Sequence, residues 1–173
     1  MKFVSCSYAD HGNEVLAIFN EEIINSTSLY YYQPHSLDNI RSWFADKETH
    51  DFPVLGVEDE SHRLLGFASY GTFRARPAYK YSVEHSIYVH KDYRGQRIGR
   101  ALLQQLIAAA VKQDYHMMIG GIDAENTGSI EFHKKLGFVH AGTIKQAGFK
   151  FGRWLDLAFY QLLLETPMQP KDG

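Results

Sequence analysis

The chain has 173 residues, which is the length of a single domain because one hydrophobic core typically serves ~100–200 residues. Hydrophobic residues make up 45% and charged residues 22%, a balance that is ordinary for globular proteins and excludes a disordered chain. Eighteen lysines and arginines stand against twenty acidic residues, and the resulting net charge of -2 excludes the broad basic surface typical of nucleic-acid-binding proteins.

The first half of the chain alternates between strand and helix patterns. Asp10 and Ser36 belong to the residue types that cap helices, and each precedes apolar residues at helical spacing. Two apolar runs joined by the short turn 59–62 predict an antiparallel pair of strands. We therefore expect, in chain order, a strand over 2–8, a helix from Asp10 to about residue 24, an aromatic-rich loop over 25–34, a helix over 37–47 capped by Ser36, and strands over 54–57 and 64–73.

In the second half, polar and apolar residues alternate along residues 81–89, which predicts a strand with two distinct faces. We expect Val83, His85, Ile87 and Val89 on one face, and Ser82, Glu84, Ser86 and Tyr88 on the other. The later elements are a polar stretch over 91–96, a helix to about residue 113, a strand over 117–122, a helix over 126–136 that Gly137 ends, and strands over 138–144 and 153–164. This order predicts a mixed sheet with helices on its faces.

Further sequence features indicate the compartment and the domain organisation of the protein. A single cysteine, Cys6, excludes an intrachain disulfide and is predicted to be a small buried side chain. No apolar run reaches the ~18 residues of a membrane span, and no basic segment followed by an apolar stretch marks a signal peptide. We therefore expect a cytoplasmic protein with no membrane and no nucleic acid among its partners. Residues 1–164 are expected to form the one domain, and residues 165–173, with two of the five prolines, a flexible C-terminal tail.

A basic loop that contains glycine leads into the helix after residue 93. A helix N-terminus carries free N–H groups and the positive end of the helix dipole, so acidic residues are its usual neighbours. This sequence instead places Arg94, Arg97 and Arg100 there, with Gly95 and Gly99 between them. The three cations repel one another unless an anion lies among them, which predicts a phosphate or pyrophosphate site; the alternative is a solvated basic loop. The spacing matches neither a P-loop nor a dinucleotide-binding fingerprint.

No metal site is predicted. His85 and His90 are five residues apart on a strand and therefore face opposite sides, which makes them a poor pair of ligands. The sequence also lacks a His-Glu-x-x-His motif and a cysteine cluster.

The segment Val89–Leu103 resembles the acetyl-CoA loop of the GNAT superfamily of N-acetyltransferases, whose pattern is Gln/Arg-x-x-Gly-x-Gly/Ala. Arg94 stands at the first position of the pattern and Gly99 at the last. Arg97 stands where the motif has its middle glycine, a departure that is compatible with the motif if the Arg97 backbone is helical. Downstream, residues 126–138 resemble the asparagine, the aromatic-rich helix and the Gly-Phe of the superfamily.

A closer resemblance, to the phosphinothricin and methionine sulfoximine N-acetyltransferase family, covers nearly the whole chain apart from the tail. The stretches that carry it are 68–74, 83–90, 121–126 and 139–157. It implies the GNAT fold, an α/β (α+β) fold whose mixed, mostly antiparallel central sheet has helices on both faces. It also implies a homodimer that moves an acetyl group from acetyl-CoA to the α-amino group of phosphinothricin, methionine sulfoximine or methionine sulfone, a detoxification or resistance activity. Two alternatives stay open: an acetyltransferase for another amine such as a protein N-terminus, and a non-catalytic acyl-CoA-binding regulator.

The resemblance also assigns roles to single residues. Glu84 is the expected catalytic base for the acceptor amine. His133 stands where many members carry tyrosine, and its expected role is to protonate the departing CoA thiolate or to aid a water-mediated deprotonation, with a structural role as the alternative. The strand around Tyr88 is expected to offer backbone N–H groups to the thioester oxygen. The expected cofactor-binding residues are Ile87, Tyr88, Val89, Arg94, Gly95, Gln96, Arg97, Ile98, Gly99, Arg100, Asn126 and Ser129.

The acceptor site needs side chains that bind a carboxylate or a phosphinate. Arg74 and Arg76 follow the end of a predicted strand, and a planar guanidinium suits such oxygens. Aromatic residues are candidates for the walls of this site, with ordinary core packing as the alternative for each of them. The expected substrate-binding residues are Phe73, Arg74, Arg76, Glu84 and Tyr30.

Overall fold

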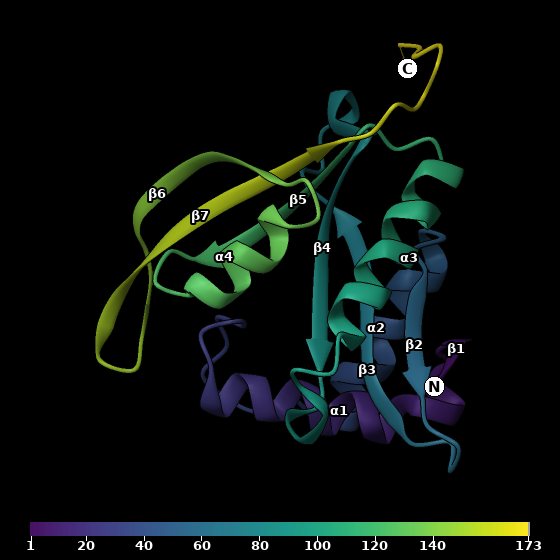
Figure 1. Cartoon of the computed structure of the whole chain (residues 1–173), viewed down its shortest axis with the longest axis vertical. Coiled ribbons are helices and arrows are strands. Elements are labelled where there is room, and N and C mark those ends of the chain that lie inside the picture. Colours follow the sequence, from purple (N-terminus) through teal and green to yellow (C-terminus); the bar gives the residue numbers. More distant parts are fainter. Residues whose placement is uncertain (173) are drawn as a thin grey trace. The chain divides into compact units, whose positions relative to one another are not determined.

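The computed structural model describes residues 1–172, in which seven strands form one mixed sheet accompanied by four α-helices (Figure 1). The strand order in the sheet is β1-β2-β3-β4-β5-β7-β6. The elements are β1 (Lys2–Ser5), α1 (Tyr8–Asn25), α2 (Leu37–Thr49), β2 (Val54–Glu58), β3 (Leu64–Thr72), β4 (Ser82–Val89), α3 (Ile98–Lys112), β5 (Met117–Asp123), α4 (Thr127–Lys134), β6 (Val139–Lys150) and β7 (Arg153–Leu163), with short 3-10 turns over Pro77–Tyr79 and Lys91–Tyr93.

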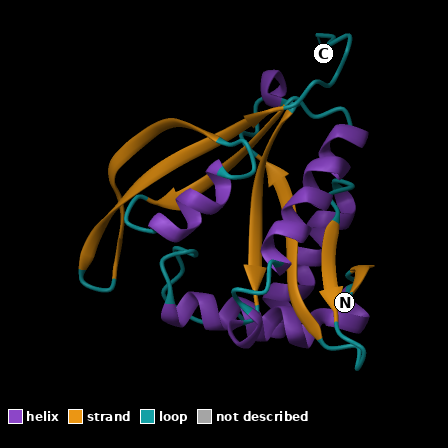
Figure 2. Ribbon diagram, viewed as in Figure 1, coloured by secondary structure: helices purple, strands orange, loops and turns teal. Residues whose placement is uncertain are grey.

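The strands, orange in Figure 2, are mostly antiparallel to their neighbours. The antiparallel pairs are β1 with β2, β2 with β3, β5 with β7, and β6 with β7. β4 and β5 pair in parallel over three positions, from Ser82 with Met117 to Glu84 with Ile119. The predicted mixed, mostly antiparallel sheet is therefore confirmed, as is the predicted antiparallel pairing of β2 with β3.

Contacts within the chain group it into two compact units. The first contains Met1–Tyr70 and Ser86–Leu106, and the second contains Gly71–His85 and the chain from Ile107 onward. β3, β4 and α3 therefore each contribute residues to both units.

The core of the first unit is aromatic. Phe19 of α1 packs edge-on against Trp43 of α2 and Phe67 of β3, with ring centroids 5.3 and 5.1 Å apart. Gly66, the neighbour of Phe67, faces the other way, because a Cβ added there would lie 3.4 Å from Leu102 Cδ1 of α3. Adjacent strand residues point to opposite faces of a sheet. Helices α1 and α3 thus cover opposite faces of β3, in agreement with the prediction of helices on both faces.

The second unit contains β5, α4 and the long β6–β7 hairpin (Figure 1). Asn126 caps α4 with its side chain, and Gly137 follows the helix with φ +90, a left-handed conformation that favours glycine. The prediction that Gly137 ends this helix is confirmed. Arg153 of β7 forms an ion pair of 2.5 Å with the buried carboxylate of Asp123 at the end of β5, which ties the two strands together.

Two predicted boundaries at the N-terminus were wrong. α1 begins at Tyr8 and is capped by Ser7, whose Oγ accepts the N–H of Asp10 at 3.1 Å. Asp10 itself lies in the first turn, where its charge favours the helix dipole. Because Ser7 already turns the chain into the helix, β1 ends at Ser5 instead of Tyr8. The predicted cap of α2 is confirmed, since Ser36 and Asn39 form a reciprocal capping box.

Near the two ends of the described chain, one side chain is buried and another is hydrogen-bonded. Cys6 is buried as predicted, and burial, with smaller contributions from Glu58 and Glu14, raises the pKa of its thiol to about 12. Beyond β7, Thr166 Oγ1 donates to the Tyr115 carbonyl at 2.5 Å. Gly173, the last residue of the expected tail, lies outside the described residues.

Within residues 1–172, none of the helices combines the length and apolar character that a membrane crossing requires.

Candidate active site

The basic loop before α3 contains two residues with left-handed backbone. Gly95 has φ +78 and Arg97 has φ +64. The helical backbone that would make Arg97 compatible with the resembled motif is therefore not the one this residue adopts. Arg97 instead takes the conformation that a glycine adopts without strain, at the position where the resembled motif has glycine, and a residue with a Cβ adopts it at a cost of ~1–2 kcal/mol. The loop thus has the backbone shape of a glycine-containing loop although arginine occupies the position.

The three arginines of this loop differ in their partners. Arg94 Nη2 donates to Oε1 of the buried Glu22 at 2.6 Å, and Glu22 also accepts from Ser26 Oγ at 2.6 Å. Arg94 is therefore already paired with a carboxylate of α1. Arg97 and Arg100 are exposed, and among the described residues neither forms an ion pair. An incoming phosphate would therefore meet two uncompensated guanidinium groups and the first N–H groups of α3.

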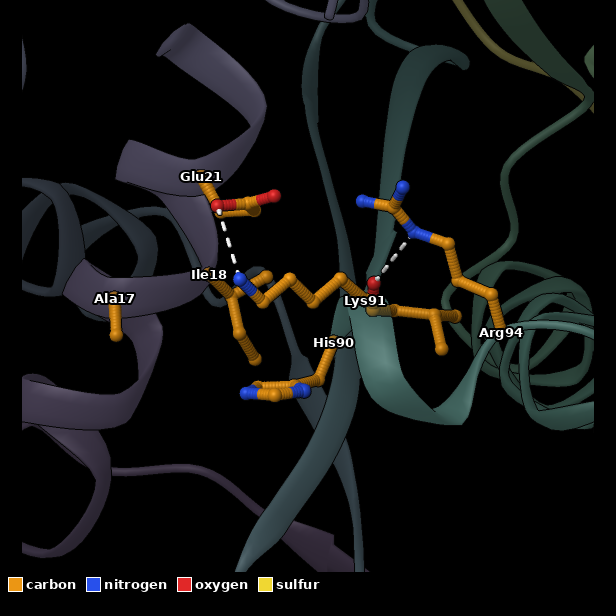
Figure 3. A pocket seen from close by; sticks show the side chains of 7 residues that line it. Ala17, Ile18, Glu21, His90, Lys91 and Arg94 are labelled. Atoms are coloured by element: carbon orange, nitrogen blue, oxygen red, sulfur yellow. Dashed lines mark hydrogen bonds and ion pairs between the residues drawn. The ribbon is translucent and has the colours of Figure 1, made fainter. Parts of the chain in front are cut away.

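A small pocket of about 200 Å³ lies beside this loop, in the first unit. Figure 3 shows Lys91 extending toward Glu21, with Nζ and Oε2 3.9 Å apart. Arg94 Nε donates to the Val89 carbonyl at 3.3 Å, which fixes the side chain along the end of β4. Both cations of this pocket have carboxylate partners, so it is not strongly positive. Its lining residues are Ala17, Ile18, Glu21, Val89, His90, Lys91 and Arg94.

We expect Arg97→Gly to relieve the backbone strain of the loop and raise the free energy of unfolding by up to about 1 kcal/mol. The same change removes a guanidinium and is expected to raise the KM for acetyl-CoA roughly three- to tenfold. Arg100→Ala serves as the matched variant, because it removes a guanidinium without relieving strain. Chemical denaturation and initial rates measure both effects, and an unchanged KM in both variants would rule the arginines out as phosphate ligands.

Glu84 lies on β4 in the second unit, half-buried and next to β5. A Cβ added to Gly121 would lie 3.2 Å from Glu84 Oε1, so the carboxylate occupies the space that this glycine leaves open. Burial raises the pKa of Glu84, and the charge of Arg74 opposes that rise. Among the described residues Glu84 forms no ion pair within 4 Å. A carboxylate with a raised pKa and no bound cation is suited to accept a proton.

His133 of α4 and His85 of β4 form a buried pair. Their Nε2 atoms are 3.2 Å apart and their rings stack with centroids 5.0 Å apart. The pair lies against Gly120 of β5, where an added Cβ would come within 2.8 Å of His85 Nε2. Burial lowers the pKa of His85 to about 3 and also lowers the pKa of His133. Both rings are therefore neutral at physiological pH.

The hydrogen bonds determine which nitrogens of the pair carry protons. His133 Nδ1 lies 2.7 Å from the Ser129 carbonyl, which only accepts, so Nδ1 carries the proton and donates. The Nε2 of a neutral His133 then accepts, and His85 Nε2–H donates to it. His85 Nδ1 is left as a buried lone pair, with no hydrogen-bond partner among the described residues. His85, which the sequence suggested only as a poor metal ligand, thus connects β4 to α4.

The expected cofactor residues of α4 have structural tasks of their own. Asn126 Oδ1 accepts the Ser129 N–H at 3.0 Å and so caps the helix. The Ser129 carbonyl is the acceptor for His133. On β4, Tyr88 is buried and its ring contacts Phe19 at 5.0 Å, so this side chain belongs to the core of the first unit.

The expected acceptor residues fall in both units. Phe73 follows β3, its ring contacts Phe159 of β7 at 6.5 Å, and the Arg74 guanidinium lies 5.0 Å from the same ring. Arg76 is exposed and precedes a 3-10 turn, in which its carbonyl accepts the Tyr79 N–H. The second unit therefore brings Phe73 and Arg74 together, and the influence of Arg74 on Glu84 is the electrostatic one described above. Tyr30 belongs to the first unit, in the segment between α1 and α2.

The described part of the chain contains no preformed metal-binding site. Within residues 1–172, no three His, Cys, Asp or Glu side chains are grouped so that they could hold a metal ion.

Comparison with known proteins gives matches over most of the chain. Residues 17–138 match the model of the acetyltransferase (GNAT) family. The L-methionine sulfoximine/L-methionine sulfone acetyltransferase of Pseudomonas aeruginosa is 42% identical over 151 residues, which cover 87% of this chain and 88% of that protein. A solved structure from Acinetobacter baylyi ADP1 is 56% identical, with a TM-score of 0.98 and coverage of 99% of this chain and 96% of its own. The phosphinothricin acetyltransferase of Sinorhizobium meliloti, solved in complex with acetyl-CoA, is 33% identical, with a TM-score of 0.92 and coverage of 99% and 92%.

Proposed function

Because the chain belongs to the acetyltransferase (GNAT) family, we propose that it acetylates the α-amino group of a small amino-acid analogue, with acetyl-CoA as the donor. The proposed acceptors are those that appear in the names of the relatives, namely methionine sulfoximine, methionine sulfone and phosphinothricin. The observation that carries this proposal in the structure is Glu84, a half-buried carboxylate with a raised pKa and no ion-pair partner among the described residues.

The proposed reaction is a direct transfer in a ternary complex. Glu84 accepts a proton from the α-ammonium group, directly or through water, and the free amine attacks the thioester carbonyl. A C–N bond forms, the C–S bond breaks, and CoA leaves as a thiolate that takes up the second proton lost by the acceptor nitrogen, while Glu84 releases its own proton to water. Backbone N–H groups of Ile87–Val89 are proposed to stabilise the oxyanion that develops on the carbonyl oxygen. Arg74 and Arg76 are proposed to bind the acceptor carboxylate, and Phe73 and Tyr30 are the other proposed substrate-binding residues.

Acetyl-CoA fits the residues of the basic loop. The left-handed residues Gly95 and Arg97 turn the chain so that it enters α3 at Ile98, and Arg97 and Arg100 have no carboxylate partner among the described residues. We propose that the loop N–H groups and these arginines bind the pyrophosphate, and that Asn126 and Ser129 contact the pantetheine arm. The remaining loop residues assigned to this site are Arg94, Gln96 and Gly99.

We propose that His133 acts as a positioning residue for β4, the structural alternative among its expected roles. What supports this role is that Nδ1 is bound to the Ser129 carbonyl and Nε2 to His85. His85 directly follows Glu84 in the chain, so the histidine pair holds β4 in place next to Glu84.

The test of the proposed function is the release of CoA thiol in the presence of acetyl-CoA and a panel of amines. We expect turnover with methionine sulfone, methionine sulfoximine or phosphinothricin, and none with peptides that have a free N-terminus. Turnover with the peptides alone would favour an N-terminal acetyltransferase. Binding of acetyl-CoA without turnover of any amine would favour a regulator.

We also propose a cytoplasmic homodimer whose acetyltransferase domain is residues 1–164, followed by a tail over 165–173. Large apolar side chains that are exposed on the β6–β7 hairpin support the dimer, because such patches mark interfaces. They are Val139, Ile144, Phe149, Phe151, Trp154 and Leu163. Light scattering is expected to give twice the chain mass of 19.8 kDa, and the mass of one chain at micromolar concentration would contradict this.

A further inference from the structure

A second and larger pocket, of about 520 Å³, lies in the first unit and shares Tyr88 with the site described above. Its volume falls within the range of ~300–1,000 Å³ that is typical of sites for small molecules. Residues of α1, α2, β3, β4 and the segment between α1 and α2 form its walls. They are Phe19, Leu29, Tyr31, His35, Asn39, Ile40, Ser42, Trp43, Asp46, Lys47, Ser69, Ser86 and Tyr88.

One wall of this pocket is a rigid group of aromatic rings. Phe19 contacts Trp43 and Tyr88 with centroid distances of 5.3 and 5.0 Å. On the exposed side of the pocket, the ring of Tyr31 packs edge-on against His35 at 4.5 Å. Such a wall favours a short, unbranched stem with a methyl group or a sulfur atom, which aromatic rings contact favourably.

Lys47 supplies a cation at this aromatic wall. Its Nζ lies 5.4 Å from the centre of the Trp43 ring and 5.5 Å from that of Phe52. It donates one hydrogen bond, of 2.8 Å, to the Tyr70 carbonyl. Burial lowers its pKa, and the neighbouring charge of Asp46 only partly opposes that effect. Among the described residues, Lys47 forms no ion pair within 4 Å.

This placement leaves hydrogen-bonding capacity that a ligand can use. An ammonium group has three donors, and a half-buried cation is stabilised when an oxygen with negative charge accepts from it. The pocket also contains Ser86, which follows Glu84 by two residues along β4. Residues two apart on a strand share a face, so the side chains of Glu84 and Ser86 project from the same face of β4.

We propose that the pocket is the subsite for the side chain of the acceptor amino acid. In this subsite Lys47 donates a hydrogen bond to an oxygen that is bound to the sulfur or phosphorus atom of the acceptor. The inference rests on the proposed function and adds the origin of its selectivity. A sulfone, a sulfoximine or a phosphinate presents such an oxygen at the end of a two-carbon stem, whereas the thioether of methionine presents none. Methionine would place its stem on the same aromatic wall and leave Lys47 without the new hydrogen bond.

The kinetic test compares methionine sulfone with methionine, which differ only in the two sulfonyl oxygens. Lys47→Met is expected to lower kcat/KM for methionine sulfone at least tenfold, to change kcat/KM for methionine less than twofold, and to leave the KM for acetyl-CoA unchanged. Lys47→Arg, which keeps the charge, is expected to retain more of the selectivity. Lys112→Met is the control, because Lys112 is exposed at the end of α3. An equal loss with both acceptors, or no loss with methionine sulfone, would overturn the proposal.

A binding measurement answers the question without turnover. The chain has two tryptophans, and Trp154→Phe leaves Trp43 of the pocket as the only one. With CoA in place of acetyl-CoA, methionine sulfone is expected to change the Trp43 fluorescence saturably, and Lys47→Met in the same background to weaken this binding at least tenfold. The Trp43→Phe variant, which keeps Trp154, is expected to give no such signal.

The outcomes separate the two proposals. Absence of a saturable Trp43 signal, or an equal affinity in Lys47→Met, would overturn the side-chain subsite even if the enzyme turns over. Failure of every acceptor to release CoA would instead overturn the proposed function, while the fluorescence titration would still report on the pocket.

Discussion

Glu84→Gln is expected to lower kcat about 10²–10⁴-fold with methionine sulfone, because the variant keeps the shape of the side chain and loses its basicity. The pH dependence identifies the cause. Since burial raises the pKa of Glu84, the acid limb of the kcat/KM profile of the natural protein should lie above the ordinary value of 4.5. In the variant this limb should disappear, and the rate should rise toward alkaline pH as the free amine accumulates.

The stability of the same variant provides a control against simple unfolding. A carboxyl group whose pKa is raised in the folded state binds its proton more tightly there, so its ionisation destabilises the fold as the pH rises through that pKa. Replacing Glu84 with a neutral amide should therefore leave the Tm at neutral pH unchanged or raise it. Glu60→Gln, in the exposed turn between β2 and β3, should affect neither rate nor Tm. An unchanged pH profile in Glu84→Gln would remove this residue as the base.

Gly120→Ala is expected to have the second largest effect. Its new methyl group would lie 2.8 Å from His85 Nε2 and 3.4 Å from His133 Nε2, distances that require the pair to move. Overpacking of this kind costs about 1–3 kcal/mol, which corresponds to a Tm lower by about 2–12 °C for a chain of this size. Because His85 follows Glu84 on β4, we expect kcat to fall as well, with a smaller change in the KM for acetyl-CoA.

Gly128→Ala is the matched control for this prediction. A Cβ at Gly128 of α4 would approach Asn126 Oδ1 no closer than 3.8 Å, and alanine favours a helix. The control should therefore be as stable as the natural protein or slightly more so. Calorimetry and initial rates measure both variants, and a Gly120→Ala protein with unaltered Tm and kcat would show that the histidine pair does not position β4.

The parts of the fold that sequence predicts well are those governed by local chemistry. Ser36 and Asn39 cap α2 through contacts three residues apart, and Gly137 ends α4 because its backbone is left-handed. The extent of β6 was missed beyond residue 144. Its extension to Lys150 depends on pairing with Arg153 across the hairpin, which no pattern within β6 itself announces.

The candidate site divides in the same way. The basic loop could be found from sequence because three arginines at a helix start are locally anomalous. The individual roles of these arginines could not be found from sequence, because Arg94 pairs with Glu22, which is 72 positions away in the chain. The pairing of His85 with His133 spans 48 positions and depends on the space above Gly120. Lys47 gave no signal either, because an ordinary surface lysine of a helix has the same sequence context.

The measurement that tests the central claim most directly is product analysis after incubation with acetyl-CoA and methionine sulfone. Mass spectrometry and a thiol assay on the same samples quantify the acetylated product and CoA. We predict that N-acetyl methionine sulfone and CoA form in a one-to-one ratio at a rate proportional to the enzyme concentration, and that Glu84→Gln lowers both together. CoA release that does not depend on the acceptor, or no acetylated product with methionine sulfone, methionine sulfoximine and phosphinothricin alike, would contradict it.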